Sequence, residues 1–320
     1  MTNEPYVLVV STLADVATDY VVKRLSHKGV ALHRINTEQY PFSSTLAFQP
    51  AAELSATWLN VNCEWLPEPA SVWYRRLRVP TSPQGMDPGV YDFCLREARA
   101  ALIGGLMTSV PRWMSHPTMV WQAEHKPFQI AMANRLGLRT PRTIVTNDPE
   151  RVRDSFREFK SMVVKPVRSG HLFNEGKEYS IFTSRLLEEH LIEIDRARWS
   201  PAIYQELVPK LFDVRVTVVG TRVFAALIDS QSDPAAEIDW RQTNNAQLPH
   251  YPAVLPDGLV AKILNLMQAL QLSFGAIDLI QTPDGEFVFL EVNPAGQWLW
   301  LDDKLELGIS DAVADWLTPA

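Results

Sequence analysis

The stretch FGAIDLIQTPDGEFVFLEVNP, residues 274–294, decides the fold expected for this chain. Two runs rich in β-forming residues flank TPDGE, and this combination of Pro, Asp and Gly is typical of a tight turn. The stretch therefore predicts an antiparallel hairpin. With the turn at Pro283–Gly285, Asp278 falls opposite Leu290 or Glu291.

Polar side chains share one face of this predicted hairpin. Glu291 and Asn293 are two residues apart, so they point the same way along a strand, beside Asp278. The intervening Val292 and Ile277 point into the core. Two carboxylates and an amide oxygen are ligands that Mg²⁺ prefers, so Asp278, Glu291 and Asn293 form a candidate magnesium site. The alternative is a set of satisfied polar groups at a strand end, and the cost of burying carboxylates without neutralisation disfavours it.

Two lysines and one extended segment add to this hairpin. Lys165 ends the strand predicted for SMVVKP, and Lys126 lies in EHKPFQ before a helix. A lysine that ends a buried strand needs an anionic partner, which nucleotide phosphates would supply. YQELV, residues 204–208, is an apolar extended stretch that carries Gln205 and Glu206. The alternatives are a solvated surface lysine and a plain strand.

The organisation of the rest of the chain predicts an α/β protein. Residues 5–36 predict strand, helix and strand, and such a βαβ unit indicates a parallel sheet. No GxGxxG joins that strand to its helix, so dinucleotide binding is unsupported there. Residues 41–70 are expected to form a small antiparallel section, residues 90–110 a helix, and NEGKE the turn of a further hairpin.

The gross composition excludes several classes of protein. The chain has 320 residues, which favours two or three lobes, and its 46% apolar and 21% charged residues favour a globular protein. A net charge of −7 makes nucleic acid an unexpected partner. No signal peptide or membrane-spanning run is visible. Cys63 and Cys94 have no metal-type spacing, and two free thiols indicate a cytoplasmic protein.

Several motifs, taken in order, carry a resemblance to the ATP-grasp ligases. They are Lys126, VVKP, YQELVPKLFDVRVTVVG, GAIDLI and FLEVNP, and together they cover about residues 110–295. The resemblance implies an α/β (α+β ATP-grasp) fold in three parts: an N-terminal parallel-sheet pre-ATP-grasp domain (1–112), a central lid domain (113–202) and a C-terminal antiparallel-sheet domain (203–320). ATP would lie between the last two parts.

A narrower resemblance covers nearly the whole chain. SVWYRR, SHPTMVWQAEHKPFQIAMANRLGLRTPRTIVTNDP, IDWR and NPAGQWLWL resemble segments of the graspetide ligases, the microviridin-type enzymes that install side-chain ester or amide cross-links in ribosomally made peptides. One segment departs from the wider superfamily. RSGHLFNEGKE carries only Gly170 and Gly176 where many ATP-grasp enzymes have a Gly-rich loop. This segment resembles the hairpin that docks the leader peptide in graspetide ligases.

The resemblance implies a role for each candidate residue. Lys126 and Lys165 would hold the ATP phosphates. The adenine and ribose end would be lined by Gln205, Glu206 and Val208. Arg215 would contact the γ-phosphate or the acyl-phosphate, and Asp213 would orient Arg215 or the ribose. Mg²⁺ would be carried by Asp278, Glu291 and Asn293. Arg241 would reach the acidic side chain of the substrate and, with Arg215 and Lys165, form the catalytic set.

These roles predict a ligase that uses ATP and Mg²⁺. It would phosphorylate a Glu or Asp side chain of a precursor peptide, made of a leader and an acidic, Thr-rich core, and close it onto a Ser/Thr hydroxyl or a Lys amine. A homodimer is expected, with no nucleic acid or membrane as partner. One rival is an ATP-grasp ligase that joins an amino acid to a peptide or small carboxylate. Another is a nucleotide-binding or leader-binding module without catalysis, which the complete metal set disfavours.

Overall fold

The computed structural model describes residues 4–49, 59–108, 112–168, 170–174, 177–243 and 247–319. The chain divides into two compact units. The first comprises residues 1–119, 272–274 and 308–320, and the second residues 120–271 and 275–307. The three-domain division expected from the sequence stays a prediction. No helix in the described residues is long and apolar enough to cross a membrane.

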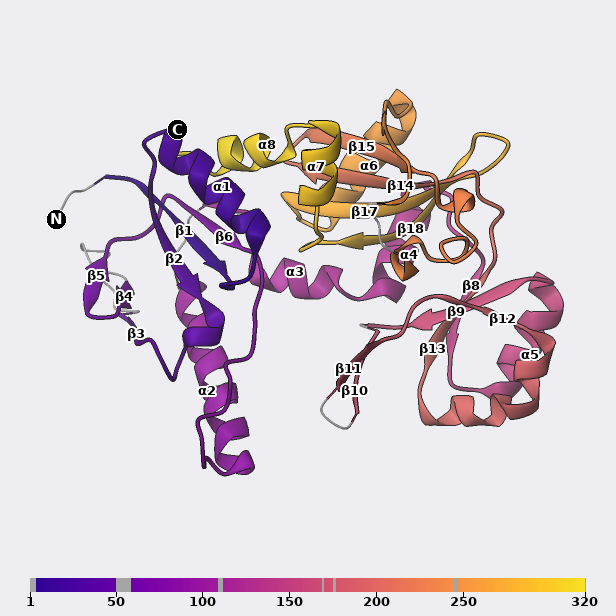
Figure 1. The fold of residues 1–320 in the computed structure, drawn as a ribbon, viewed down its shortest axis with the longest axis horizontal. Coiled ribbons are helices and arrows are strands. Elements are labelled where there is room, and N and C mark those ends of the chain that lie inside the picture. Colours follow the sequence, from indigo (N-terminus) through magenta and orange to yellow (C-terminus); the bar gives the residue numbers. More distant parts are fainter. Residues whose placement is uncertain are drawn as a thin grey trace. The chain divides into compact units, whose positions relative to one another are not determined.

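The first unit is built on a parallel sheet of order β2-β1-β6-β7 (Figure 1). The predicted βαβ opening is confirmed by β1, α1 and β2, and the small antiparallel section by β3, β4 and β5. Its elements are β1 (Tyr6–Ser11), α1 (Val16–His27), β2 (Ala31–Asn36), η1 (Thr37–Gln39), β3 (Leu46–Phe48), β4 (Leu59–Val61), β5 (Glu64–Leu66), β6 (Ser71–Tyr74), α2 (Pro88–Leu106), β7 (Arg112–Trp113) and α8 (Ile309–Leu317).

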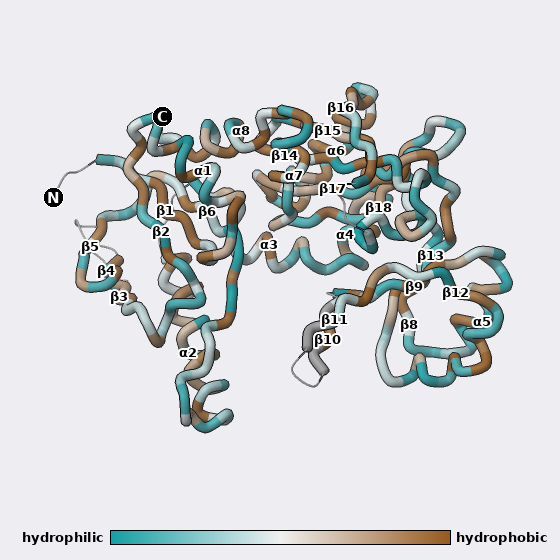
Figure 2. Tube along the Cα trace, in the orientation of Figure 1, coloured by the Kyte–Doolittle hydropathy of each residue, from teal (hydrophilic) through white to brown (hydrophobic). Residues whose placement is uncertain are grey.

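The core of this unit lies around β1, whose residues Val7 to Val10 have no exposed surface. Figure 2 shows the hydrophobic run along β1 and β6. A continuous apolar strand is expected where helices cover both faces of a parallel sheet. The C-terminal helix α8 belongs to this unit because Arg24 of α1 pairs with Asp311 at 2.6 Å, and Ser71 Oγ donates to the Leu317 carbonyl at 2.6 Å.

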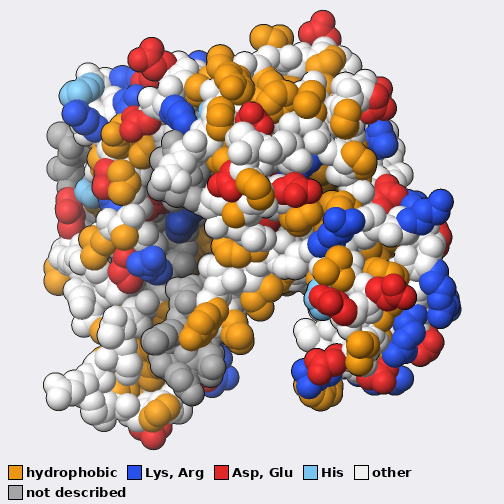
Figure 3. All heavy atoms as spheres, turned by 45° about the vertical axis from the view of Figure 1, so that its right-hand side comes forward, with side chains coloured by type: hydrophobic (Ala, Val, Ile, Leu, Met, Phe, Trp, Pro, Cys, Tyr) orange, Lys and Arg blue, Asp and Glu red, His pale blue; other side chains and the backbone are white. Residues whose placement is uncertain are grey.

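The described residues of the second unit form two larger antiparallel sheets and the two-stranded hairpin β10–β11 (Figure 1). The first, of order β12-β9-β13-β8, packs against α5, and charged side chains of both signs cover the outside of this lobe (Figure 3). The helix α3 (Pro117–Ala123) runs from the first unit into the second. The elements that follow it are α4 (Lys126–Arg135), β8 (Thr143–Thr146), α5 (Pro149–Phe159), β9 (Met162–Pro166), the hairpin β10 (His171–Asn174) and β11 (Lys177–Ser180), β12 (Ser184–Leu186), η2 (Glu188–Trp199) and β13 (Ala202–Glu206).

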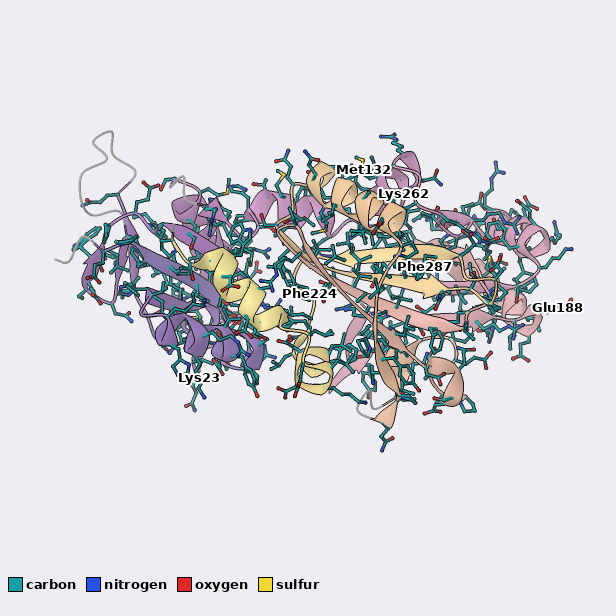
Figure 4. All side chains as sticks on the ribbon, turned by 90° about the horizontal axis from the view of Figure 1, so that it is seen from above. Lys23, Met132, Glu188, Phe224, Lys262 and Phe287 are labelled. Atoms are coloured by element: carbon teal, nitrogen blue, oxygen red, sulfur yellow. The ribbon has the colours of Figure 1, made fainter. Side chains whose placement is uncertain are left out.

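The other sheet has the order β16-β15-β14-β17-β18, and α4 and α6 lie against it. On the outer side of α6, Lys262 donates to the Gly137 carbonyl at 2.8 Å, beyond the end of α4 (Figure 4). The elements are β14 (Phe212–Val219), β15 (Arg222–Ile228), η3 (Ser230–Ser232), η4 (Trp240–Gln242), β16 (His250–Ala253), α6 (Asp257–Ala269), β17 (Phe274–Gln281), β18 (Phe287–Asn293) and α7 (Leu299–Leu305).

One sequence expectation about the helices is wrong. The sequence predicts a helix only after Lys126, but Lys126 is itself the first residue of α4, and Pro117–Ala123 forms the further helix α3 before it. Pro127 has no N–H, so the hydrogen-bond ladder of α3 cannot run on into α4. The predicted hairpin around NEGKE is present as β10 and β11, while Gly176 and the turn at residues 175–176 lie outside the described residues.

Candidate functional site

The hairpin of β17 and β18 has the predicted register. Asp278 lies directly opposite Glu291, and Asn293 lies opposite Ala276. The ladder shifts between Asp278 and Leu279, so the count along the strands alone left the choice between Leu290 and Glu291 open. Ile277 and Val292 are buried, at 0% and 2% exposure, which confirms that they point into the core. The two carboxylates are therefore neighbours on one face of the sheet.

Basic side chains from several other elements surround these carboxylates. Arg215 on β14 places Nη1 2.8 Å from Asp278 Oδ1. Lys126, the first residue of α4, places Nζ 2.9 Å from Glu291 Oε2. Among the described residues, Lys165 on β9 has no carboxylate within ion-pairing distance, although it is only 8% exposed. Arg241 on η4, which pairs with Asp239, also places Nη1 3.9 Å from Glu291 Oε1, so four cations face three carboxylates.

The pKa values follow from this imbalance. Burial, helped by the nearby charges of Lys126 and Arg241, lowers the pKa of Lys165 to about 8, although the charge of Glu291 acts to raise it. Burial acts to raise the pKa of Glu291, but Lys126, Lys165 and Arg241 outweigh it and hold that pKa well below its usual range. Glu291 is consequently ionised, and Lys165 is the cation that lacks a counter-charge.

A further buried donor points to an anion at the same place. Arg215 donates through Nη1 to Asp278 and through Nη2 to the Gln297 carbonyl at 3.0 Å. Its Nε is buried and has no hydrogen-bond partner among the described residues. An unpaired buried N–H is costly and rare in folded proteins. Phosphate oxygens would satisfy both this N–H and the charge of Lys165.

Two cavities of the second unit meet at this cluster. One is a slot with apolar walls that include Val163, Ile280 and Leu290, closed by the chain at residues 205–208. The other is a polar cavity of about 490 Å³ reached by Lys126, Arg168 and Asn293. Both are lined by Lys165, Thr183, Arg241 and Glu291. The four shared residues mark where groups held in the two cavities would come together.

The remaining predicted site residues lie in or beside these cavities. Gln205, Glu206, Val208 and Asp213 line the slot. The side chain of Gln205 donates to Thr143 Oγ1 at 2.8 Å, and Glu206 pairs with Arg142, so both side chains are already held by the segment around β8. Asp213 pairs with Lys210 at 2.7 Å rather than with Arg215.

The predicted magnesium ligands, two carboxylates and one amide oxygen, could hold a cation only together. No group of three or more His, Cys, Asp and Glu side chains that could hold a metal occurs in the part of the chain that the structure describes. The expected set has two carboxylates, and its third member, Asn293, is exposed and accepts a hydrogen bond from the Ala295 N–H at 3.2 Å. Two adjacent carboxylates suit a divalent ion that completes its shell with phosphate oxygens and water. The magnesium assignment stays a prediction.

Three supporting residues escaped the sequence reasoning. Gln129 on α4 exchanges two hydrogen bonds with the backbone of Val292, of 2.7 and 2.9 Å, and so fixes the edge strand β18 against the helix that carries Lys126. Lys210 neutralises Asp213, and Asp239 holds Arg241. The DWR triplet and the i, i+3 spacing of Lys210 and Asp213 were visible in the sequence, whereas Gln129 and Val292 lie 163 positions apart.

Gly296 is required beside Arg215, and its replacement is a first prediction. A Cβ at this position would lie 2.3 Å from Ala276 Cβ and 2.8 Å from Arg215 Nη2. Gly296→Ala should therefore displace the guanidinium and destabilise the fold by about 1–3 kcal/mol. Urea unfolding measures the loss. Gly258→Ala is the matched control, since nothing lies within 4 Å of its Cβ, and equal stability of the two variants would contradict the prediction.

Comparison with known proteins agrees with this geometry. Residues 6–119 match the model of the MvdD pre-ATP grasp domain. An ATP-grasp ligase of Chryseobacterium gregarium, associated with ribosomally synthesised and post-translationally modified peptides (RiPPs), superposes with a TM-score of 0.91 and 29% identity, over 98% of this chain and 96% of that one. The chain has the fold of the ATP-grasp ligases over nearly its whole length. The predicted family and fold class are thereby confirmed.

Two further ligase structures support this assignment. The macrocyclase MdnC of Microcystis aeruginosa, solved with its precursor peptide MdnA, matches with a TM-score of 0.86 and 29% identity over 97% of this ligase and 98% of MdnC. The ATP-grasp ligase PsnB, solved with a variant of its minimal precursor, Mg and ADP, has a TM-score of 0.79 at 22% identity, with 98% of each chain covered, and shows the fold alone. None of the proteins with curated functions matches the sequence significantly.

Proposed function

We propose that this ligase uses ATP and Mg²⁺ to cross-link side chains of a ribosomally made precursor peptide. The observation that carries the proposal is the junction of two cavities at Lys165, Arg241 and Glu291. The apolar slot suits a nucleotide base, and the polar cavity suits an acidic side chain of a peptide. The structures most similar to this chain at 29% identity include ligases complexed with leader, core or precursor peptides.

The chemistry proceeds in two displacements. A Glu or Asp carboxylate oxygen of the peptide attacks the γ-phosphorus, the bond to the ADP oxygen breaks, and an acyl-phosphate forms. A Ser/Thr hydroxyl or Lys amine then attacks the acyl carbon, the bond to the phosphate oxygen breaks, and the nucleophile loses its proton. Arg241 holds the acidic side chain, while Lys126, Lys165 and Arg215 offset the phosphate charge as it redistributes. Asp278, Glu291 and Asn293 would hold Mg²⁺, which supplies charge neutralisation at the phosphates.

Mass spectrometry of a candidate precursor tests the proposal. The ligase with ATP and Mg²⁺ should lower the mass of the peptide by multiples of one water. A ligase that joins an amino acid to a peptide or small carboxylate would instead raise the mass of its acceptor. An unchanged precursor mass with every acidic, Thr-rich peptide from the same gene neighbourhood would count against cross-linking.

Nucleotide binding should take up a proton, which is a second prediction. The pKa of Lys165 is lowered to about 8 while its pocket lacks phosphate, so a large part of it is neutral at pH 8.5. Phosphates favour the charged form and raise this pKa, so the ligase should bind a fraction of a proton along with ADP. Calorimetry at pH 8.5 in buffers of different ionisation enthalpy measures that fraction. It should vanish in Lys165→Met and persist in Lys23→Met, whose lysine is exposed.

A homodimer and a cytoplasmic location are further parts of the proposal. The location follows from the need for ATP and from two free cysteines. For the dimer, α2 exposes Val90, Phe93 and Met107, at 52, 58 and 43%. Antiparallel pairing of two α2 helices about the middle of this face would set the bulky Phe93 of one copy against the small Gly104 of the other. We therefore propose α2 as the contact between copies.

The expected effect of breaking this contact is a third prediction. Phe93→Glu places a charge in an apolar helix contact and should convert the dimer to a monomer in sedimentation velocity. Trp199→Glu is the control, since Trp199 is 82% exposed on η2 in the other compact unit, and this variant should remain a dimer. A dimer that persists in Phe93→Glu would rule out α2 as the interface.

A further inference from the structure

The backbone of Thr183 is held from both sides by the segment around η4. Its N–H donates to Asp239 Oδ2 at 3.1 Å, and its carbonyl accepts from Gln242 Nε2 at 3.1 Å. Thr183 lies two residues after Ile181, whose N–H bonds the Gly170 carbonyl at the base of the hairpin β10–β11. The base of that hairpin is therefore joined to η4 through a very short piece of chain.

Asp239 also fixes the guanidinium of Arg241. It is 4% exposed and accepts from Arg241 Nε at 2.8 Å, from Nη2 at 2.7 Å and from the Arg241 N–H at 3.2 Å. The paired bonds occupy one edge of the planar fork, and Nη1 then lies 3.9 Å from Glu291 Oε1 at the junction of the two cavities. The Arg241 side chain is 44% exposed, so without Asp239 it would be free to adopt other rotamers.

Asp239 thus holds two groups with one buried carboxylate. If the Thr183 N–H moved away, this carboxylate would lose one hydrogen-bond donor. Each lost partner of a buried acceptor costs free energy. The Asp239 carboxylate could replace the lost hydrogen bond only by shifting. Because Arg241 is bound to it through both Nε and Nη2, the guanidinium would move with it. Replacement of Asp239 by a neutral group would release Arg241 while leaving the phosphate cations and the apolar slot in place.

We infer that Asp239 is a positioning residue that aims Arg241 at the acidic side chain of the substrate and makes this aim depend on the base of the hairpin β10–β11. The inference rests on the proposed function, because it assigns regulation to the same site. The hairpin base, Thr183, Asp239 and Arg241 form one continuous chain of hydrogen bonds and short backbone links. A peptide that moves the hairpin base would change how well Arg241 is placed, without touching the nucleotide slot.

The experiment is a double-mutant cycle on the full chain with precursor peptide and ATP. Asp239→Asn should lower kcat/KM for the peptide about 10–100-fold, the loss caused by imperfect positioning of reacting groups, and leave KM for ATP within about twofold. In the background of Arg241→Ala the same change should have almost no further effect, because Asp239 acts through that arginine. Glu237→Gln, the same chemical change at an exposed position two residues earlier, should match the wild type. Full additivity of the two losses would overturn the inference.

A second measurement does not depend on catalysis. Hydrogen exchange at residues 181–184 should be faster in Asp239→Asn than in the wild type, since the acceptor of the Thr183 N–H has been weakened. Unchanged exchange would overturn the link to the hairpin base even if the kinetic cycle succeeded. If the wild type releases no phosphate with any peptide while exchange responds as expected, the proposed function fails and the link between Thr183 and Asp239 stands.

Discussion

Glu291→Gln should lower peptide-dependent phosphate release about 10²–10³-fold, the loss typical of removing one group that stabilises developing charge. Glu291 is ionised, faces Asp278, and is shared by the two cavities. The amide keeps the volume of the side chain and removes its charge. A divalent ion would lose one of two carboxylates, and Lys126 and Arg241 would lose their common partner. Release of inorganic phosphate in the presence of peptide measures the effect.

The control for this variant lies on the same hairpin. Glu286 is exposed where the turn enters β18, and Glu286→Gln should retain the wild-type rate. A cooperative urea transition in both variants would show that the fold survives. Wild-type activity in Glu291→Gln would remove Glu291 from the metal set and leave Asp278 as the one carboxylate of the proposed site.

Lys165→Met should abolish phosphate release and at the same time make the protein more stable. The rate should again fall about 10²–10³-fold, because Lys165 is the cation whose counter-charge only a ligand supplies. The gain in stability has the opposite origin, since a buried ammonium without a partner is replaced by an apolar side chain of similar length. A loss of activity together with a gain in stability would show that the variant is folded and that its lost activity is not caused by unfolding.

The pH dependence fixes the sign of this stability effect. The pKa of Lys165 falls from 10.5 in the unfolded chain to about 8 in the native one. Below pH 8 both states are charged and the native state carries the full penalty, about 3 kcal/mol. Between pH 8 and 10.5 the unfolded chain binds more protons, so the wild type gains stability as pH rises. The advantage of Lys165→Met in urea unfolding should therefore be largest near pH 7 and shrink toward pH 10. Equal free energies of unfolding at pH 7 would contradict it.

Local patterns predicted much of the fold because they act through neighbours in sequence. The turn TPDGE fixed the hairpin that carries Asp278 and Glu291, and the order of motifs identified the ATP-grasp family before any contact was known. Asp148 caps α5 by accepting from the Glu150 N–H at 3.0 Å, with Pro149 in the first turn, a local arrangement typical of helix starts. Such features depend on a few residues at fixed spacing.

Other elements gave no comparable signal. The 3₁₀ segment η2 and the helix α7 were not predicted. Helix α7 begins at Leu299, between the two tryptophans of NPAGQWLWL, with Trp298 as its N-cap. Trp298 is fully buried, and the ring centroid of Trp300 lies 5.3 Å from that of Trp240, so both tryptophans act as packing residues.

The sequence by itself determined which side chains carry charge at the site and on which strand face they lie. It also indicated which protein family the chain resembles. Only the tertiary structure decided which charges neutralise one another. Gln129 reaches Val292 across 163 positions, Arg215 reaches Asp278 across 63, and Thr183 reaches Asp239 across 56. No spacing rule encodes such pairs, because they form only when separate elements pack. The same packing leaves Lys165 buried with no carboxylate of the described residues within ion-pairing distance, and that electrostatic imbalance is the physical basis of the proposed phosphate site.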